Sequence, residues 1–173
     1  MYISKRIAVV LLTASALGGS AATAVTALGQ ENHQGEGQRE HGNRVVLATS
    51  LAPSVPTDPT LLGAVAGNVP WVLESGKAKL HGDGRLTVRI RGLLIPSGQF
   101  AGTTGPVKTV SASLYCGASP TPVGTSSAVP LSSDGDARIA TTLALPAKCQ
   151  IPALLIHPNG APGAYITTSG FGG

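Results

Sequence analysis

The chain has 173 residues, a length that suits one domain with tails. Apolar residues make up 42% of it and charged residues only 12%, which excludes a chain that stays disordered for lack of apolar side chains. Twelve basic against eight acidic residues give a formal net charge of +4, and 23 glycines and 13 prolines break the apolar runs into short pieces that favour an all-β domain.

The first 27 residues predict a secretory signal peptide. Lys5 and Arg6 precede an uncharged run over residues 7–17, and small residues follow up to Ala24 and Ala27, after either of which cleavage is expected. The alternative is an uncleaved anchor helix, but serine, threonine and glycine dilute the run. Cleavage would leave ten basic residues against eight acidic ones, so overall basicity is weak evidence for a nucleic-acid or membrane partner.

A polar segment rich in glycine, glutamine and glutamate follows the signal. Residues 28–43 have no apolar periodicity and predict a flexible linker. His33 and His41 lie in it, and we interpret them as solvated linker residues because two histidines in a flexible tail make only a weak metal site. The folded domain is therefore expected over residues 44–173.

The sequence of this domain predicts short strands and turns and no helix. Strands are predicted at 44–51, 71–81, 85–95, 107–116, 138–145, 151–157 and 164–171, with at most a short one at 127–131. Three prolines between 52 and 60 predict an extended surface connection. The pattern predicts an antiparallel immunoglobulin-like β-sandwich of seven to eight strands, and a closed barrel is the alternative.

The stretch from 71 to 95 predicts a hairpin whose register follows from its alternation. The apolar even-numbered positions of both arms must share one buried face, so Leu80 is expected opposite Leu86 and Ala78 opposite Val88. A three-residue loop then joins the arms, and Gly84 supplies its left-handed residue.

The alternation of this hairpin breaks near its open end. Glu74 would point into the core if the strand continued regularly through Ser75–Gly76. We therefore predict a β-bulge at Ser75–Gly76, which would return Leu73 and Trp71 to the buried side.

The other face of the hairpin is basic. The register places Lys77 opposite Arg89, and like charges in such pairs are mildly destabilising. Five cations share this face: Lys77, Lys79, Arg85, Arg89 and Arg91. They are the candidate contacts for an anionic partner, and the alternative is a solvated face or an edge guarded by charge.

The chain has two cysteines, Cys116 and Cys149. An even pair in a secreted chain predicts one disulfide, and both cysteines lie beside strand-like segments. Closing a loop of this size would restrict the unfolded state by about 3–4 kcal/mol on the chain-entropy model. The alternative is a pair of buried thiols.

Motifs with a known chemistry are missing. The sequence contains no nucleophile elbow, phosphate-binding loop, HExxH zinc motif or dinucleotide fingerprint. Within the predicted domain His81 and His157 are the two histidines, too few for a convincing metal site. Six aromatic residues in the whole chain argue against a carbohydrate cleft. No catalytic residue, metal or cofactor is therefore predicted.

Several strings together resemble a known group of proteins. PWVLESGKAKL, DGRLTVRIRGLLIP, GPVKTVSASLYCG and DARIATTLALPAKCQIPALLIHPNG are similar to segments of small secreted proteins of unassigned function from high-GC Gram-positive bacteria. The resemblance covers residues 44–173. It implies secretion and a disulfide between the two cysteines, and it carries no catalytic residue.

The expected function is that of a secreted, non-enzymatic binding or structural module at the cell envelope. Its candidate partner is an anionic cell-wall polymer, and neither nucleic acid nor, after signal cleavage, a membrane is expected. One alternative is a small secreted hydrolase or metal-dependent enzyme that uses His81 and His157. Another is a surface or coat component that assembles through sheet edges.

Overall fold

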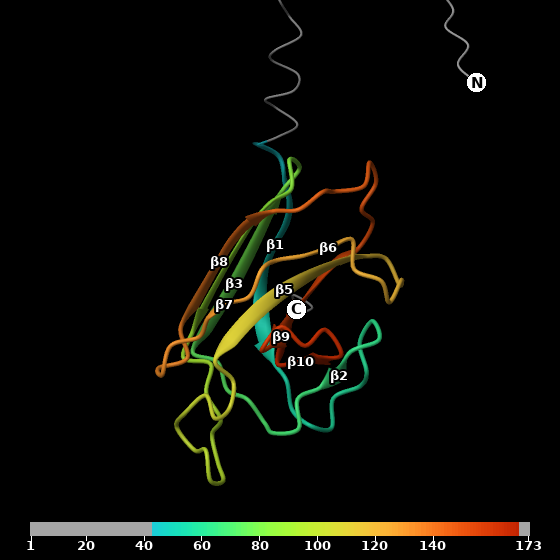
Figure 1. The fold of residues 1–173 in the computed structure, drawn as a ribbon. Helices are drawn as coiled ribbons and strands as arrows, with labels where there is room; N and C mark the ends of the chain where they lie inside the picture. The colour runs from blue at the N-terminus through green and yellow to red at the C-terminus, as the bar shows by residue number, and fades with distance from the viewer. Residues whose placement is uncertain (1–42, 170–173) are drawn as a thin grey trace, which may run out of the picture. The chain divides into compact units, whose positions relative to one another are not determined.

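A computed structural model describes residues 43–169 of the chain (Figure 1). The predicted signal peptide, the predicted linker except Asn43, and residues 170–173 lie outside the described residues. The prediction of an antiparallel all-β domain is confirmed. The strands are β1 (Val45–Pro53), β2 (Val65–Ala66), β3 (Ser75–His81), β4 (Arg85–Arg91), β5 (Thr109–Cys116), β6 (Gly124–Thr125), β7 (Val129–Pro130), β8 (Ala137–Thr142), β9 (Pro152–Pro158), β10 (Ala164–Tyr165) and β11 (Thr167–Ser169).

Nine of these strands form one curled antiparallel sheet. Their order is β6–β5–β9–β11–β1–β3–β4–β8, and β7 pairs with β5. Strand β1 links the two halves of the sheet, because residues up to Ser50 pair with β3 whereas residues from Leu51 pair with β11. The strands β2 and β10 form a separate two-residue parallel ladder.

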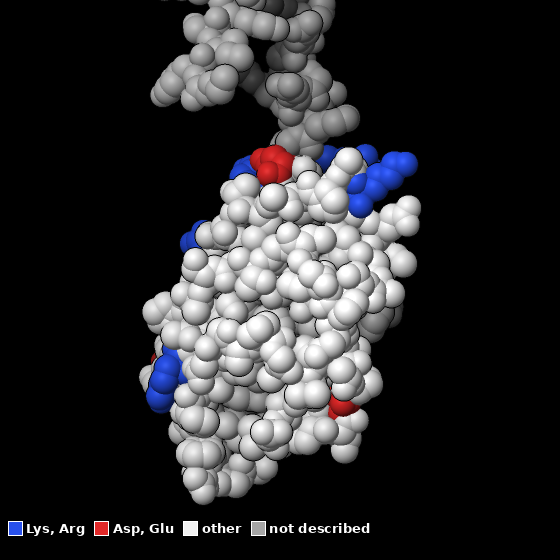
Figure 2. Space-filling model, turned by 45° about the vertical axis from the view of Figure 1, so that its right-hand side comes forward, with Lys and Arg blue, Asp and Glu red and all other residues white. Residues whose placement is uncertain are grey.

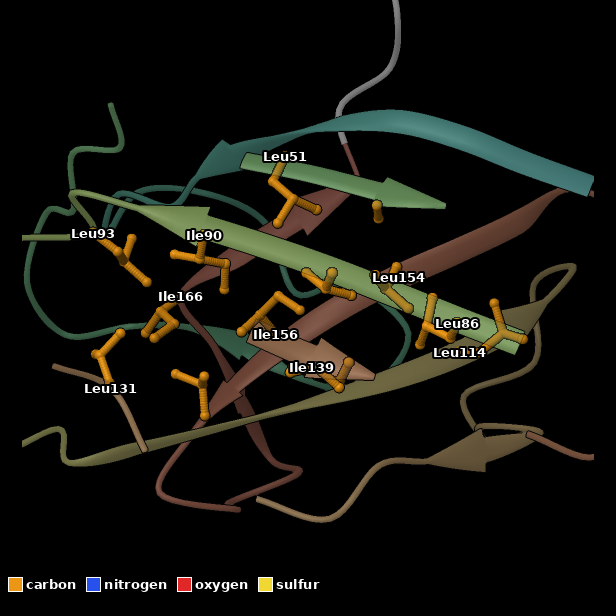
Figure 3. Close-up of a cluster of buried hydrophobic side chains, with 14 of the residues drawn as sticks. Leu51, Leu86, Ile90, Leu93, Leu114, Leu131, Ile139, Leu154, Ile156 and Ile166 are labelled. Atoms are coloured by element: carbon orange, nitrogen blue, oxygen red, sulfur yellow. The ribbon is translucent and has the colours of Figure 1, made fainter. Parts of the chain in front are cut away.

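The two halves of the sheet enclose one apolar core. Even-numbered residues of β3, β4 and β5 point inward, because successive side chains of a strand alternate between its faces. Figure 3 shows side chains of β4, β5, β8 and β9 meeting between the halves. The largest fully buried aliphatic residues of this core are Leu80, Leu86, Ile90, Leu93, Ile95, Leu114, Ile139, Leu154 and Ile156.

The predicted register of the β3–β4 hairpin is confirmed. Leu80 pairs with Leu86, and Lys77 pairs with Arg89. The loop contains three residues, and Gly84 at its end has φ of 86°, a left-handed value that disfavours any residue with a Cβ atom. A Cβ atom at Gly84 would also overlap the carbonyl oxygen of Leu143, so glycine is required there for two reasons.

The predicted bulge at Ser75–Gly76 is wrong. Ser75 pairs with Arg91 in the register of the rest of the hairpin, and the isolated bridge between Val72 and Leu94 keeps that register. Both arms leave the ladder together, with Gly92 in a left-handed conformation (φ 61°), so no residue is inserted on one arm alone. The described register shift lies in the β1–β3 ladder, near the start of β1.

Strands β5 and β9 are buried on both faces. Their outer face packs in a second small cluster, in which Tyr115 and Leu155 contact Tyr165 and the segment from Leu61 to Ala66. The hydroxyl of Tyr165 donates to the carbonyl oxygen of Pro59 at 2.8 Å and ties that segment down. The last predicted strand, 164–171, is therefore split into β10, which belongs to this layer, and β11, which belongs to the sheet.

The predicted disulfide between Cys116 and Cys149 is present, with the two Cα atoms 4.9 Å apart. It joins the end of β5 to the segment that leads into β9. The backbone N–H of Gly117 also donates to the carbonyl oxygen of Ile151 beside it, so the covalent link continues the β5–β9 ladder.

Candidate functional site

The five predicted cations lie on one exposed face. Side chains at the odd-numbered positions of β3 and β4 point away from the core, and those at the even-numbered positions are buried. Local alternation of the sequence is sufficient to produce this face. The cations are Lys77, Lys79, Arg85, Arg89 and Arg91, and all five are exposed.

A sixth cation, Arg138 on β8, belongs to the same face. Arg89 pairs with Lys77 on one side and with Arg138 on the other, so three cations occupy one row across three neighbouring strands. Neighbouring strands lie about 4.8 Å apart. Ser50 of β1 continues the row beyond Lys77. We call these six cations, including Arg138, the basic face, and Lys77, Arg89 and Arg138 the central row.

One member of the basic face is already paired. The Nε atom of Arg85 lies 2.6 Å from Oδ2 of Asp83 in the hairpin loop. The backbone N–H of Arg85 donates to the same carboxylate, and this hydrogen bond, assisted by the side-chain bond and the nearby charge, holds the pKa of Asp83 below its usual value. Within residues 43–169, none of the other five members lies within 4 Å of a carboxylate.

A shallow hollow of about 620 Å³ lies over this face between β1 and β4. Its basic walls are Lys77, Lys79 and Arg89, and its floor contains small residues with hydroxyl or methyl groups, such as Ser50 and Thr87. No aromatic side chain lines it. The hollow therefore offers charge and hydrogen-bond donors but no surface on which a nucleobase or sugar ring would stack.

The positive charge is localised. Figure 2 shows a face of the domain that is almost free of charged side chains, with Lys and Arg confined to its upper end and one edge. Residues 43–169 contain nine basic residues, and six of them belong to the basic face.

Sequence reasoning missed Arg138. The alternation around Ile139 already placed it on an outward face, but the neighbour of a strand is set by the fold. Strand β8 follows β4 only after the intervening strands β5, β6 and β7, so no local pattern showed that Arg138 lies opposite Arg89.

The structure does not bring the two domain histidines together. His81 ends β3 and pairs with Val45 at the start of β1. His157 follows Ile156, which pairs with Thr167 of β11. Thr167 in turn pairs with Pro53 at the other end of β1. The length of β1 separates these ends by roughly 26 Å. The predicted alternative of a shared His81–His157 site is therefore wrong, and no group of three metal-ligating side chains occurs in the described part of the chain.

His157 is fully buried and has a structural hydrogen bond. Its Nδ1 atom lies 2.6 Å from the carbonyl oxygen of Ala164, and its Nε2 atom is buried without a partner in the described region. Burial disfavours the charged imidazolium and lowers the pKa of His157 below its usual value, although the bond to Ala164 opposes this shift.

Comparison with known proteins finds no matching family model, no similar curated protein and no similar solved structure. The basic face is therefore interpreted from its own chemistry. Within residues 43–169, no helix has the length and hydropathy that are needed to cross a membrane.

Proposed function

We propose that this chain is a secreted, non-enzymatic binding module that holds an anionic polymer of the cell envelope on its basic face. The observation that carries the proposal is the central row, in which Lys77, Arg89 and Arg138 lie side by side on three strands. In the described residues no carboxylate lies within 4 Å of any of the three.

Such a row is unfavourable in the free protein. Like charges directly opposite one another in a ladder destabilise the sheet, by about 0.2–1 kcal/mol for each pair. A polyanion that lies along the row would relieve both pairs at once and would contact the cations of β3 and β4 that flank them. Repeated anions on one flexible chain would bind through several weak contacts, so the complex would weaken steeply as salt is added.

An extended polymer suits this face better than a compact ligand. The hollow is open and shallow, and its lining provides no buried polar side chain that would enclose a small anion. The lining of the hollow contains no aromatic side chain. Single-stranded nucleic acid is therefore a less suitable ligand, because proteins usually hold it by stacking as well as by charge. A polymer with charged groups and no bases fits the chemistry of the lining.

Several features support export. The disulfide is typical of oxidising compartments, and the predicted signal peptide and the resemblance to secreted proteins agree with it. We also propose that the curled sheet is a variant of the predicted immunoglobulin-like sandwich, because two strand layers share one core and β1 passes from one layer to the other.

The test compares two variants with the same loss of charge. In the first, Lys77, Arg89 and Arg138 of the secreted chain are replaced by Gln. In the second, the exposed cations Arg44, Lys108 and Lys148, which lie outside the basic face, are replaced by Gln. Retention on purified Gram-positive cell walls is measured at increasing salt, before and after acid extraction of the anionic polymers.

We expect the central-row variant to lose retention on intact walls at low salt. The control variant should keep most of its retention. Walls from which the anionic polymers have been extracted should retain both variants poorly. Equal retention of the two variants would show that only net charge matters and would overturn the proposal. Retention that survives polymer extraction would also contradict it.

A further inference from the structure

A second candidate site lies away from the basic face. A pocket of about 220 Å³ is formed where the segment from Gly67 to Trp71, the segment from Ile95 to Val107 and the connection between β9 and β11 meet. Its walls are apolar, with Ile95, Phe100 and Ile166 among them. No charged side chain lines it, and Asn68 and the indole of Trp71 are its two side chains with polar atoms.

Trp71, which lines the pocket, also carries an unused hydrogen-bond donor. Trp71 is only 3% exposed, and its indole Nε1–H has no acceptor in the described part of the chain. A buried donor without a partner is destabilising, so native proteins rarely keep one without a reason.

Gly67 leaves space beside this donor. A Cβ atom at Gly67 would lie 3.1 Å from Nε1 of Trp71 and 3.3 Å from Cγ2 of Ile166. The backbone of Gly67 is not left-handed, so its conformation does not demand glycine. The missing side chain instead lets the backbone of Gly67, which itself lines the pocket, pack directly beside the indole edge.

We infer that this pocket binds a proline residue of an extended peptide, whose carbonyl oxygen accepts the hydrogen bond of Trp71 Nε1–H. The lining selects the ligand by three properties. It rejects charge, because no ionisable side chain is present to pair with it. It requires one acceptor for the indole. It disfavours a ligand that brings N–H or O–H donors, because Asn68 is the one side chain that would receive them.

Proline meets these three conditions better than other residues. It has an apolar ring and a carbonyl group but no backbone N–H. The pocket volume lies below the roughly 300–1,000 Å³ of sites for whole small molecules, so it suits one residue of a longer chain. Proline-rich segments are commonly recognised by aromatic-lined grooves, and here Trp71 and Phe100 provide the aromatic walls.

Binding involves a local opening of the pocket. The indole nitrogen is covered in the free chain, so an acceptor reaches it when a neighbouring wall moves aside. Phe100 is 37% exposed and lies on the loop that forms one wall.

The test uses the fact that Trp71 is the sole tryptophan of the chain. The ¹⁵N-labelled full chain gives one indole N–H signal, which is followed during titration with a blocked hexaproline peptide and, separately, a blocked glycine–serine hexapeptide. We expect hexaproline to move the indole proton downfield and to saturate, with a dissociation constant of about 0.1–1 mM. The glycine–serine peptide is expected to cause no saturable shift.

Two variants locate the site. Gly67→Ala fills the space beside the indole and is expected to weaken binding of hexaproline about tenfold or more. Phe100→Ser alters the exposed wall without touching the core and is expected to weaken binding even if Gly67→Ala proves unstable. Circular dichroism verifies that each variant is folded. An unchanged indole signal in the folded wild-type chain would overturn the inference. Equal binding of the two peptides, or full binding by folded variants, would overturn it as well.

Discussion

Arg89 lies directly opposite Arg138 in the β4–β8 ladder and directly opposite Lys77 in the β3–β4 ladder. Replacing the middle cation therefore removes two like-charge pairs at once. We expect Arg89→Gln to raise the free energy of unfolding of the free protein at low salt, by about 0.4–2 kcal/mol. Urea denaturation measures the change, which should shrink in 0.5 M salt because salt screens exposed charges.

The control for this experiment is Lys148→Gln, which removes an exposed cation outside the basic face. It should change stability by less than about 0.5 kcal/mol. If Arg89→Gln does not exceed this control, the central row is not electrostatically strained. The same variant should bind anionic polymer more weakly, so stability and binding are expected to change in opposite directions.

Gly84 closes the β3–β4 loop against Leu143, whose N–H donates to the carbonyl oxygen of Gly84. Gly84→Ala should destabilise the protein by about 3 kcal/mol or more, because a left-handed Cβ is strained and also overlaps the oxygen of Leu143. Gly98→Ala is the matched control, since Gly98 has a similar φ of 82° but no atom within 4 Å of an added Cβ. Its expected cost is about 1–2 kcal/mol. Equal losses by chemical denaturation would contradict the close contact.

The disulfide closes a loop with a sequence separation of 33 residues. Replacing Cys116 and Cys149 together by Ser should lower the free energy of unfolding by about 3–4 kcal/mol, mainly because the unfolded chain gains freedom. Reduction of the wild-type protein should produce a similar loss. A loss below about 1 kcal/mol in both experiments would indicate that the β5–β9 ladder alone holds these segments.

Burial of His157 predicts a pH dependence of stability. Its pKa is lower in the folded protein than in the unfolded chain, where it is about 6.5. The unfolded chain therefore takes up the proton first as pH falls. Stability should be complete above about pH 7 and should decline below about pH 6.5, with a slope of at most about 1.4 kcal/mol per pH unit.

Urea denaturation between pH 5 and 7.5 checks this dependence. His157→Gln should flatten the slope even if it lowers stability at every pH, because the titrating group is gone. His81→Gln is the matched control, since it also replaces a histidine but leaves the buried imidazole of His157 in place. A wild-type chain with constant stability over this range would contradict the prediction.

Local patterns predicted the hairpin well. Alternation and turn chemistry act over a few residues, so they established that Leu80 pairs with Leu86 and that Gly84 is left-handed. The bulge prediction is wrong because the alternation of one arm does not show where the other arm leaves the ladder. Gly92 on the other arm leaves the ladder at the same place and makes an inserted residue unnecessary.

Features that depend on strand order were beyond local patterns. Arg138 joins the central row only because β8 lies beside β4, far along the chain. The pocket around Trp71 is likewise built from three separate segments. The site therefore combines a hairpin that the sequence predicts with neighbours that only the complete topology identifies.

Strand β1 also has a consequence for the order of folding. The first part of β1 can pair with β3 early, since the two strands are close in the chain. The pairing of Pro53 with Thr167 forms only when β11 is available, and β11 lies more than a hundred residues further along the sequence. Contacts of such long separation form slowly. A chain that is threaded through a translocation channel would therefore keep its two sheet halves unjoined until β11 emerges.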